Sequence, residues 1–526
     1  MSHIKRGAAL LVACMVVIAG CSKSENASET GSPQPTSSTA APSKPPLETL
    51  SVMIPLFVQE APNASTDTMK KIEEYTGQKT DIQFIPSGAY DDKVNVAIAS
   101  QTTPHSFLIQ DAKSPAYLNA VRSGMFWEIG PYLKEFKNLS KLSPDLAKNV
   151  SIDGKLYGIP RVREATNVGV NFRKDWLENL GLTMPSTPDQ LYEAIKAFTL
   201  QDPDQNKKND TVGLIEYGSI AGFSQVVLWY GGPNKWGVQN DKIVPDFYHD
   251  SYFKAMDWYK RLYQEKLMNQ DFSALKVEQQ RELFNQQKGG IYLGGVSSTY
   301  SQTNPLNALM YQEKYKNAEG VKSQDDLFSK LYNFTAIKGT SGEIRLPGEL
   351  GYFGQFVFPK TSLKTEAELK QALSFFDKLQ DEPMVVLTTW GILGKHSIDH
   401  GNKIYEMVVD NNVRNKDINS LSQLSVSITN AQYKGEAKGL NPYLVRVRAY
   451  PEEFGKYAVS DPTMPFLSET LSKNPGLDSI VSDARVKYVM GLISLDDFKK
   501  EVKRWENEGG LKIIDEFTKQ YLKSKG

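Results

Sequence analysis

The chain has 526 residues, and its 61 basic side chains are matched by 61 acidic ones, so the formal net charge is zero. This balance argues against a dedicated nucleic-acid-binding protein, which carries a basic excess. A hydrophobic fraction of 40% is typical of globular proteins, and the length suffices for two or more large domains. The mean hydropathy of −0.42 excludes a polytopic membrane protein. Both cysteines, Cys14 and Cys21, lie near the N-terminus, so the rest of the chain has no disulfide and no thiol nucleophile.

Residues 1–20 have the organisation of a secretory signal peptide. Two basic residues come first, and the apolar run 8–19 that follows is too short to span a bilayer. The sequence Ile-Ala-Gly-Cys at 18–21 then resembles the lipobox of bacterial lipoproteins. The resemblance implies that Cys21 receives a diacylglycerol and anchors the protein at the extracytoplasmic face of the cell membrane. The alternative is an ordinary exported protein with an unrelated cysteine.

Residues 21–48 form a predicted tether. Positions 22–46 contain seven Ser, three Thr and five Pro, and no Val, Ile, Leu or aromatic residue. Such a composition cannot bury enough apolar surface to offset the entropy lost on folding. We therefore expect a disordered linker between the anchor and the body of the protein.

From residue 49 onward, apolar runs typical of buried strands alternate with helical patterns. Strands are predicted at 50–57, 82–85 and 106–109, with helices at 66–76 and 90–100 between them. This alternation predicts an α/β fold on a largely parallel sheet.

Later elements carry clearer boundary signals. The apolar residues of 167–172 alternate as on a half-buried strand. A helix over 188–198 begins with a proline, has Thr187 as its N-cap and has Gln190 to close a capping box. No short internal repeat occurs, which argues against solenoids and propellers.

Five segments form an ordered set along the chain: GKLYGIP at 154–160, VNFRKDW at 170–176, FNQQKGGI at 284–291, TWGILGKH at 389–396 and KYVMG at 487–491. This set resembles the extracellular solute-binding proteins that serve carbohydrate ABC importers, in particular their long lipoprotein branch. With the residues around it, the resemblance covers nearly all of 49–526.

The resemblance implies an α/β, two-lobe, periplasmic-binding-protein-like fold with a ligand cleft between discontinuous lobes. The first lobe would comprise 49–165 with a later return near 351–410, and the second 166–350 with C-terminal helices near 411–526. The implied partners are a carbohydrate, expected to be an oligosaccharide, and the permease subunits of an ABC transporter. The protein is expected to be a monomer.

Aromatic side chains in loops are candidates for covering the apolar face of a sugar ring. Trp229, Tyr230 and Trp236 surround a Gly/Pro turn, Tyr352 follows a glycine, and Trp390 precedes one. The alternative is that each aromatic residue is structural and caps a loop from within the core. Three other tryptophans are predicted to be structural: Trp176, Trp258 and Trp505.

Five polar residues occupy predicted cleft positions. Gln59 and Glu60 follow the first strand and Asp111 follows the third, at the carboxyl ends where α/β sheets bind ligands. Arg161 and Arg163 lie where the family crosses between lobes, and a guanidinium there can fork onto a pair of ring hydroxyls or a uronate carboxylate. The alternative for the arginines is an interlobe salt bridge with a neighbouring glutamate.

The segment 202–210 has the ligand spacing of an EF-hand-type calcium loop. Asp202, Asp204, Asn206 and Asp210 occupy positions 1, 3, 5 and 9, and Lys208 supplies the backbone carbonyl of position 7. Position 6 is lysine rather than glycine, and position 12 is glycine rather than glutamate. We expect one structural Ca²⁺ of modest affinity, distant from the solute; a solvated polar turn is the alternative.

Signatures of common enzymes are absent from the sequence, which has no GxSxG, HExxH or GxxxxGK[ST] motif. His396 and His400 have metal-ligand spacing only on a helix, and the glycines that flank them predict a loop. We therefore predict a non-enzymatic receptor without an organic cofactor. A membrane-anchored polysaccharide-degrading enzyme and a binding protein for a non-sugar solute such as a peptide are the alternatives.

Overall fold

The structure of the protein is a computed structural model that describes residues 47–57, 66–297, 315, 321 and 323–525. Within this part of the chain, two main β-sheets with separate hydrophobic cores define two lobes. None of its helices combines the length and the apolar character that a membrane span requires. The predicted two-lobe α/β fold is confirmed.

Lobe 1 is built on a five-stranded sheet of order β2-β1-β3-β12-β4. β1 is parallel to β2 and β3, whereas β12 is antiparallel to both of its neighbours, β3 and β4. The strands are β1 (Thr49–Leu56), β2 (Lys79–Pro86), β3 (Ser106–Ile109), β4 (Gly158–Val162) and β12 (Tyr352–Val357). The helices are α1 (Asp67–Thr76), α2 (Ser87–Ser100), α3 (Pro115–Arg122), α4 (Pro144–Val150), α14 (Glu366–Lys378), α15 (Glu382–Trp390), α16 (Asn411–Arg414) and α17 (Asn430–Tyr433), beside a small sheet of β13 (Ser397–Asp399), β14 (Ile404–Met407) and β15 (Glu436–Ala437).

Lobe 2 is built on a four-stranded sheet of order β10-β5-β9-β6. Its strands are β5 (Val168–Arg173), β6 (Val212–Leu214), β9 (Gly289–Gly295) and β10 (Tyr332–Thr335), beside the pairs β7 (Trp236–Gln239) with β8 (Lys242–Pro245) and β11 (Leu346–Pro347) with β16 (Ala458–Val459). Its helices are α5 (Lys174–Asn179), α6 (Pro188–Leu200), α7 (Phe223–Trp229), α8 (Asp250–Gln264), α9 (Val277–Asn285), α13 (Gln324–Leu331), α18 (Pro442–Phe454), α19 (Glu469–Lys473), α20 (Leu477–Val489), α21 (Leu495–Trp505) and α22 (Leu511–Lys525). β5 runs antiparallel to both β9 and β10, so the largely parallel sheet that we predicted is wrong for this lobe.

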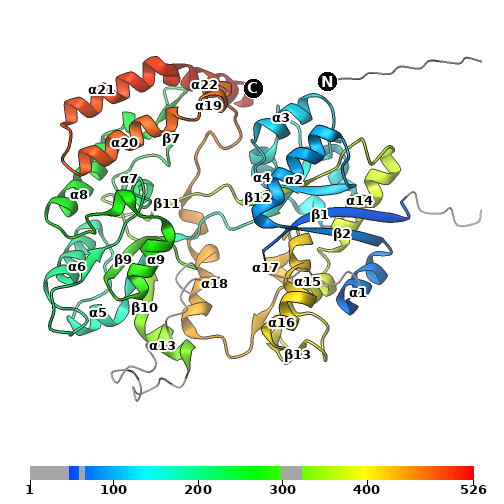
Figure 1. Cartoon of the computed structure of the whole chain (residues 1–526), viewed down its shortest axis with the longest axis horizontal. Coiled ribbons are helices and arrows are strands. Elements are labelled where there is room, and N and C mark those ends of the chain that lie inside the picture. The colour runs from blue at the N-terminus through cyan, green and yellow to red at the C-terminus, as the bar shows by residue number, and fades with distance from the viewer. Residues whose placement is uncertain (1–46, 58–65, 298–314, 316–320, 322, 526) are drawn as a thin grey trace, which may run out of the picture. The chain divides into compact units, whose positions relative to one another are not determined.

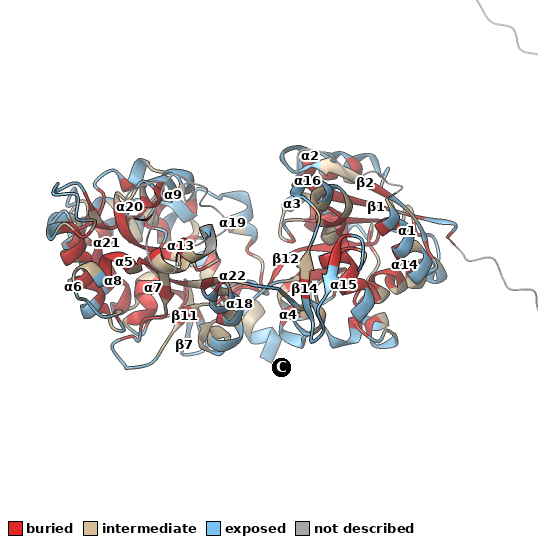
Figure 2. Ribbon diagram, turned by 90° about the horizontal axis from the view of Figure 1, so that it is seen from below, coloured by how far each residue is buried: buried red, intermediate tan, exposed pale blue. Residues whose placement is uncertain are grey.

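Each lobe is assembled from segments far apart in the sequence. Figure 1 shows the yellow helix α14 with the blue strands of lobe 1, and the orange and red helices α20 and α21 with the green helix α8 of lobe 2. Figure 2 shows that the buried residues of each lobe lie along the strands and the inner helix faces. Each core is therefore complete only when helices from later parts of the chain have packed against the earlier strands and helices.

The boundary predicted for the second lobe is wrong in one segment. Residues 411–437 were assigned to the second lobe, but Leu421, Leu424 and Val426 lie in the core of lobe 1. The reason is local: the Val162 N–H at the end of β4 donates to the carbonyl oxygen of Val426 at 2.9 Å, so this segment extends the edge of the lobe 1 sheet. The chain passes to lobe 2 only at α18.

Helix α6 begins where the sequence predicts, with one difference at its cap. The Thr187 hydroxyl accepts from the Gln190 N–H at 3.3 Å, as an N-cap does. The Gln190 side-chain oxygen, however, accepts from the N–H of Ser186 at 2.9 Å rather than from that of Thr187. Phe198 on the buried face packs so closely on β9 that a Cβ at Gly290 would lie 2.2 Å from its ring. Glycine is therefore required at this contact between helix and sheet.

Candidate functional site

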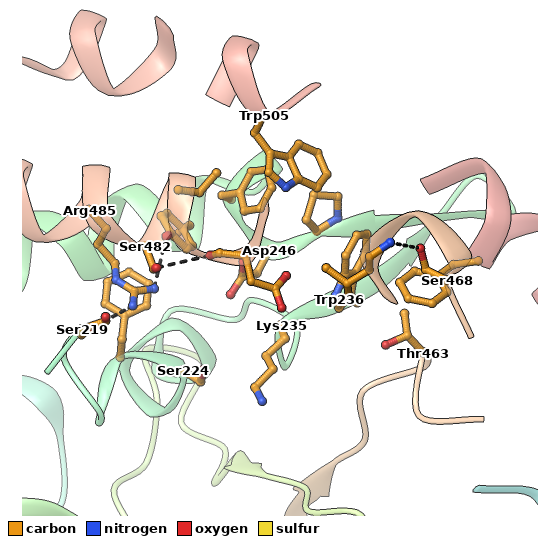
Figure 3. A pocket seen from close by; sticks show the side chains of 18 of the residues that line it. Ser219, Ser224, Lys235, Trp236, Asp246, Thr463, Ser468, Ser482, Arg485 and Trp505 are labelled. Carbon is orange, nitrogen blue, oxygen red and sulfur yellow. Dashed lines mark hydrogen bonds between the residues drawn. The ribbon is translucent and has the colours of Figure 1, made fainter. Parts of the chain in front are cut away.

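A pocket of about 710 Å³ lies among the C-terminal helices of lobe 2 and is the candidate ligand site (Figure 3). Lobe 2 forms its walls with the loop before α7, the β7–β8 hairpin, the segment 463–472 and helices α20 to α22. Among the described lining residues, Lys113 alone comes from lobe 1. The volume is in the range of small-molecule and cofactor sites.

One wall of the pocket is aromatic. Trp236 contacts Phe517 edge to face at 5.2 Å and Trp505 at 6.5 Å between ring centroids, and Phe247 packs on Trp505 at 4.9 Å. The turn before β7 fixes Trp236, because the buried Asn234 side chain donates to the carbonyl oxygens of Gly348 and Val459, both at 2.9 Å. Rings held in this way offer an apolar surface to a ligand without further ordering.

The buried carboxyl group of Asp246 faces this wall. Asp246 follows β8 and is 8% exposed, and its N–H donates to the carbonyl oxygen of Lys235 at 2.7 Å. Burial raises the pKa of Asp246 to about 7, although the nearby Arg485 and Lys235 act in the opposite direction. Figure 3 shows Asp246 between Trp505 and Lys235 in this view. A carboxyl group that opens on a pocket is a strong acceptor for ligand hydroxyls.

Arg485 on α20 is held by three contacts at the edge of the pocket. Its Nη2 donates to the carbonyl oxygen of Ser219 at 2.5 Å and its Nη1 to the Tyr252 hydroxyl at 3.3 Å, while the guanidinium lies 4.1 Å from the centroid of the Phe223 ring. The guanidinium is thus oriented before any ligand binds.

Lys113 reaches the pocket from the loop after β3. Its Nζ donates to the carbonyl oxygen of Phe466 at 3.0 Å and also to that of Met464. Burial lowers the pKa of Lys113 to about 8, against the opposing effect of Asp461 and Asp111. The loop is held by Asp111, whose carboxylate accepts from the Lys113 N–H at 2.8 Å. Lys113 therefore links the two lobes at the rim of the pocket.

Only one of the five predicted ligand-binding aromatic residues lines this pocket, and it is Trp236. Trp229 and Trp390 are wrong as binding residues because both are core residues: Trp229 has no exposed surface and contacts Trp258 at 6.0 Å, and Trp390 stacks on Tyr405 at 5.3 Å. Tyr230 is partly buried against the core of lobe 2.

Tyr352 and the predicted polar residues that the structure describes do not line the pocket. Tyr352 is packed in the core of lobe 1, and burial, together with the nearby Asp111, raises its pKa to about 12. Arg161 is buried and donates to Gln423 Oε1 at 2.9 Å and to the Ser425 carbonyl oxygen at 3.4 Å, so its side chain is structural at these contacts. Arg163 is exposed, and its Nη1 donates to the carbonyl oxygen of Val162 at 2.8 Å. Three further predicted residues lie outside the described part of the chain: Gln59, Glu60 and Cys21.

Most of the residues that line the pocket are not among the predicted site residues. Asp478, Ser482 and Arg485 recur at helical spacing on α20 and form a polar stripe that the sequence could have revealed. Trp505 was predicted to be structural, and it is both buried in the core of lobe 2 and part of the pocket wall. Asp246 carries no comparable signal, because its burial depends on helices that come more than 200 residues later in the chain.

The predicted calcium loop brings three carboxylates around one amide. The Asn206 Nδ2 donates to Asp204 at 2.7 Å and to Asp210 at 3.1 Å, and the Asn206 N–H donates to Asp202 at 3.1 Å. Burial and then the neighbouring Asp202 raise the pKa of Asp204, which indicates that the two carboxyl groups are close. The Lys288 ammonium lies 2.6 Å from Asp210.

The same loop lacks a complete set of acidic ligands. In the described residues no group of three His, Cys, Asp or Glu side chains is arranged to hold a metal ion. Position 12 cannot take a carboxylate either, because a Cβ at Gly213 would lie 2.0 Å from the carbonyl oxygen of Ile195. The exposed Lys208 of position 7 donates its N–H to Asn206 Oδ1 at 2.7 Å. The donors are of the kind that calcium takes, and the side chains would have to move closer to enclose it.

Comparison of the sequence with known proteins identifies one family. Residues 61–328 match the model of the bacterial extracellular solute-binding protein family. The chain is 36% identical over 98% of its length, and 98% of the relative, to the polygalacturonan/rhamnogalacturonan-binding protein YtcQ of Bacillus subtilis (strain 168). It is 33% identical over 99% of both chains to the lipoprotein LipO of the same organism.

A solved structure supports the fold. The HMO-binding solute-binding protein associated with an ABC transporter of Bifidobacterium longum infantis matches with a TM-score of 0.68 at 18% identity, covering 91% of this chain and 99% of that one. Both sequence relatives span nearly the whole chain, beyond the segment matched by the family model. The chain belongs to the family of bacterial extracellular solute-binding proteins.

Proposed function

We propose that the protein captures an oligosaccharide at the pocket of lobe 2 and delivers it to the permease of an ABC importer. The observation that carries this proposal is the pocket itself, where a fixed aromatic wall faces oriented polar groups. Sugars present apolar C–H faces and a rim of hydroxyls, and Trp236 opposite Asp246 and Arg485 matches both. YtcQ, a relative over nearly the whole chain, is named as a binder of the polysaccharides polygalacturonan and rhamnogalacturonan.

Lys113 provides the coupling that delivery requires. It is the lobe 1 residue in the pocket lining, and its ammonium already bonds to the chain of lobe 2. A ligand that bonds to Lys113 as well as to lobe 2 stabilises the arrangement in which both lobes contact it. Such a ligand-dependent arrangement is what a permease can distinguish from the free protein.

The proposed activity is binding without turnover. The members of this family are binding proteins, and in the pocket the Arg485 guanidinium is already bonded within the protein. The competing function, degradation of a polysaccharide, would need two carboxyl groups at a defined separation across the scissile bond. The experiment is calorimetric titration of the purified protein with pectin-derived oligosaccharides, followed by chromatography of the recovered sugar. Saturable heat with intact sugar is expected, and cleaved sugar would contradict the proposal.

We propose that Cys21 carries the lipid anchor. The lipobox-like sequence at 18–21 supports this, as does the name of LipO, a lipoprotein that matches along the whole chain. Mass spectrometry of the protein from membranes should show a diacylglycerol on Cys21, and a Cys21→Ser variant should appear in the culture medium. The unmodified protein retained at the membrane would contradict the proposal.

A calcium ion at the 202–210 loop is proposed as a structural element. The convergence of three carboxylates on Asn206 supports it. Asp202, Asp204 and Asp210 would hold the ion through carboxylate oxygens, and calcium would offset the repulsion among them. The loop connects α6 to β6, so its order affects the frame of lobe 2 rather than the pocket.

A further inference from the structure

A cluster of positive side chains lies where the chain crosses between the lobes. Four separate segments contribute Arg163 after β4, Arg414 at the end of α16, Lys434 after α17 and Arg448 in α18, and these four residues are called the cation cluster below. Burial lowers the pKa of Lys434, and the three arginines lower it further, so each of them lies within electrostatic reach of the Lys434 ammonium.

Hydrogen bonds independently hold these segments together. The Arg161 side chain donates to Gln423 and Ser425, and the Ser425 hydroxyl is 3.4 Å from the Asn430 side-chain oxygen. The Lys434 N–H in turn donates to the Asn430 carbonyl oxygen at 2.9 Å. On the lobe 2 side, Tyr450 in α18 donates to the carbonyl oxygen of Val168 at 2.8 Å, which places Arg448 beside the same crossing.

The cation cluster has few counter-charges. None of its four members forms an ion pair with an acidic side chain of the described residues. Glu164 is the acid that favours the charge of Lys434, and the Arg163 side chain donates to the carbonyl oxygen of its neighbour Val162. Arg163, Lys434 and Arg448 are exposed to solvent. Protein atoms nevertheless surround two of them, Arg163 and Lys434, so that burial lowers the pKa of both side chains.

Two arginines carry buried N–H groups without a partner. The Arg161 side chain is 2% exposed, and its Nη1 has no hydrogen-bond acceptor. The Nε of Arg414 is likewise buried and unbonded. Like charges and unsatisfied donors both cost stability, and proteins retain such groups mainly at functional sites. The missing component is therefore an anion with several acceptor oxygens.

The cation cluster shares one edge of lobe 1 with the pocket residue Lys113. The strand order β3-β12-β4 places the end of β3, the start of β12 and the end of β4 side by side, because β12 is antiparallel to the other two. Lys113 follows β3 and Arg163 follows β4, so two strand spacings, about 10 Å, separate these edges of the sheet. The Arg163 N–H donates to the Gly351 carbonyl oxygen at 2.8 Å, next to the first residue of β12. One extended ligand can reach both places.

We propose that the cation cluster binds the carboxylates of an acidic oligosaccharide, so that the ligand class is a uronate-containing sugar. This inference rests on the proposed function and names the substrate class of that function. Guanidinium groups match planar carboxylates with paired hydrogen bonds, and Lys434 adds a point charge between them. Because Arg448 belongs to lobe 2 and the other three to lobe 1, a bound carboxylate also draws the lobes together.

The test is calorimetric titration of the full chain with trigalacturonate and with its fully methyl-esterified, uncharged form. The wild type should prefer the acid, and the preference should shrink as sodium chloride is raised. The variants Lys434→Gln and Arg448→Gln should each weaken binding of the acid about tenfold, as the loss of one charge-assisted bond does. Binding of the ester should change less than twofold. Lys174→Gln, at a partly exposed lysine of α5 paired with Glu178, is the matched control and should leave both affinities unchanged.

Thermal unfolding of the same variants separates binding from structure. Removal of one like charge should leave the melting temperature of Lys434→Gln unchanged or raise it. A lowered melting temperature with equal loss of acid and ester would overturn the proposal, because the residue would then be structural. Equal affinity of the wild type for acid and ester would also overturn it while leaving the proposed function intact. Binding of neither sugar would overturn both.

Discussion

The Lys113 ammonium of lobe 1 donates a hydrogen bond to the carbonyl oxygen of Phe466 in lobe 2 over a distance of 3.0 Å. Phe466 belongs to the core of lobe 2, and Lys113 follows a strand of lobe 1. A single side chain thus joins the two lobes at the rim of the candidate pocket. Its charge and its contacts lead to the first prediction.

Lys113→Met should weaken ligand binding about tenfold by removing a charge-assisted contact. It should also change how stability depends on pH. The pKa of Lys113 is lowered to about 8 in the folded protein, so between this value and its ordinary value of 10.5 the unfolded state binds more protons. The unfolding free energy of the wild type should therefore rise relative to that of the variant by about 2 kcal/mol as the pH rises from 8 to 10. Urea unfolding at both pH values measures this, and parallel curves for the two proteins would contradict it.

Two tryptophans close together in the sequence should respond in opposite ways. Trp236→Ala removes part of the pocket wall and should weaken oligosaccharide binding about tenfold with a modest loss of stability, since Trp236 is only partly buried. Trp229→Ala leaves a cavity in the core of lobe 2 and should lower the free energy of unfolding by about 3–5 kcal/mol. Calorimetry and urea unfolding of both variants test this pair. A strong binding defect in a stable Trp229→Ala protein would contradict this prediction and would show that Trp229 contacts the ligand.

Asp246→Asn should be more stable than the wild type at neutral pH. Burial raises the pKa of Asp246 to about 7, so the folded state binds more protons than the unfolded state between about pH 4 and 7. The unfolding free energy of the wild type therefore falls by up to about 4 kcal/mol as pH rises through this window. The variant has no carboxyl group at this position and should not lose this stability. The difference in unfolding free energy between the two proteins should grow from pH 4 to pH 8. It should also be accompanied by weaker ligand binding.

Glu216 supplies a matched control for this titration. Burial also raises its pKa to about 7, and its carboxylate accepts from the Tyr259 hydroxyl at 2.7 Å, but it does not line the pocket. Glu216→Gln should alter the pH dependence of stability in the same direction and leave ligand affinity unchanged. Equal binding defects in the two variants would show that neither carboxyl group acts on the ligand directly.

Calcium binding at the 202–210 loop should depend on Lys288. Chelator-treated wild type should bind calcium with a Kd in the range of about 10⁻⁴–10⁻³ M, and Asp204→Asn should abolish the heat of binding. Lys288→Gln frees Asp210 from its ion pair and should tighten binding about two- to fivefold. Calorimetric titration of the three proteins with calcium is the measurement. The absence of heat from all three would leave the loop as a polar turn.

Local features of the fold could be predicted from the sequence, and the lining of the pocket could not. The Thr187 cap and the apolar stripe of α6 are encoded within a few residues, so helix and cap appear where expected. Trp229 and Trp390 show where such reasoning fails: both lie next to turns, and their burial depends on partners that the neighbouring sequence does not reveal, Trp258 and Tyr405. Trp236, at the start of β7, contacts Trp505 and Phe517 and is only partly buried, so it lines the pocket.

The placement of β12 between β3 and β4 has a consequence for the order in which the protein folds. All of the lobe 2 strands from β5 to β11 are synthesised before β12, so until then β3 and β4 each have an edge without its final partner. Pairing over such a long loop is slow, because its closure costs entropy before any contact forms. The five-stranded sheet of lobe 1 should therefore be completed later than the pairing of β5 with β9, and refolding followed by hydrogen exchange should show β4 protected later than β5. Until β12 has been added, the open strand edges of β3 and β4 are the places where the chain is most prone to aggregate.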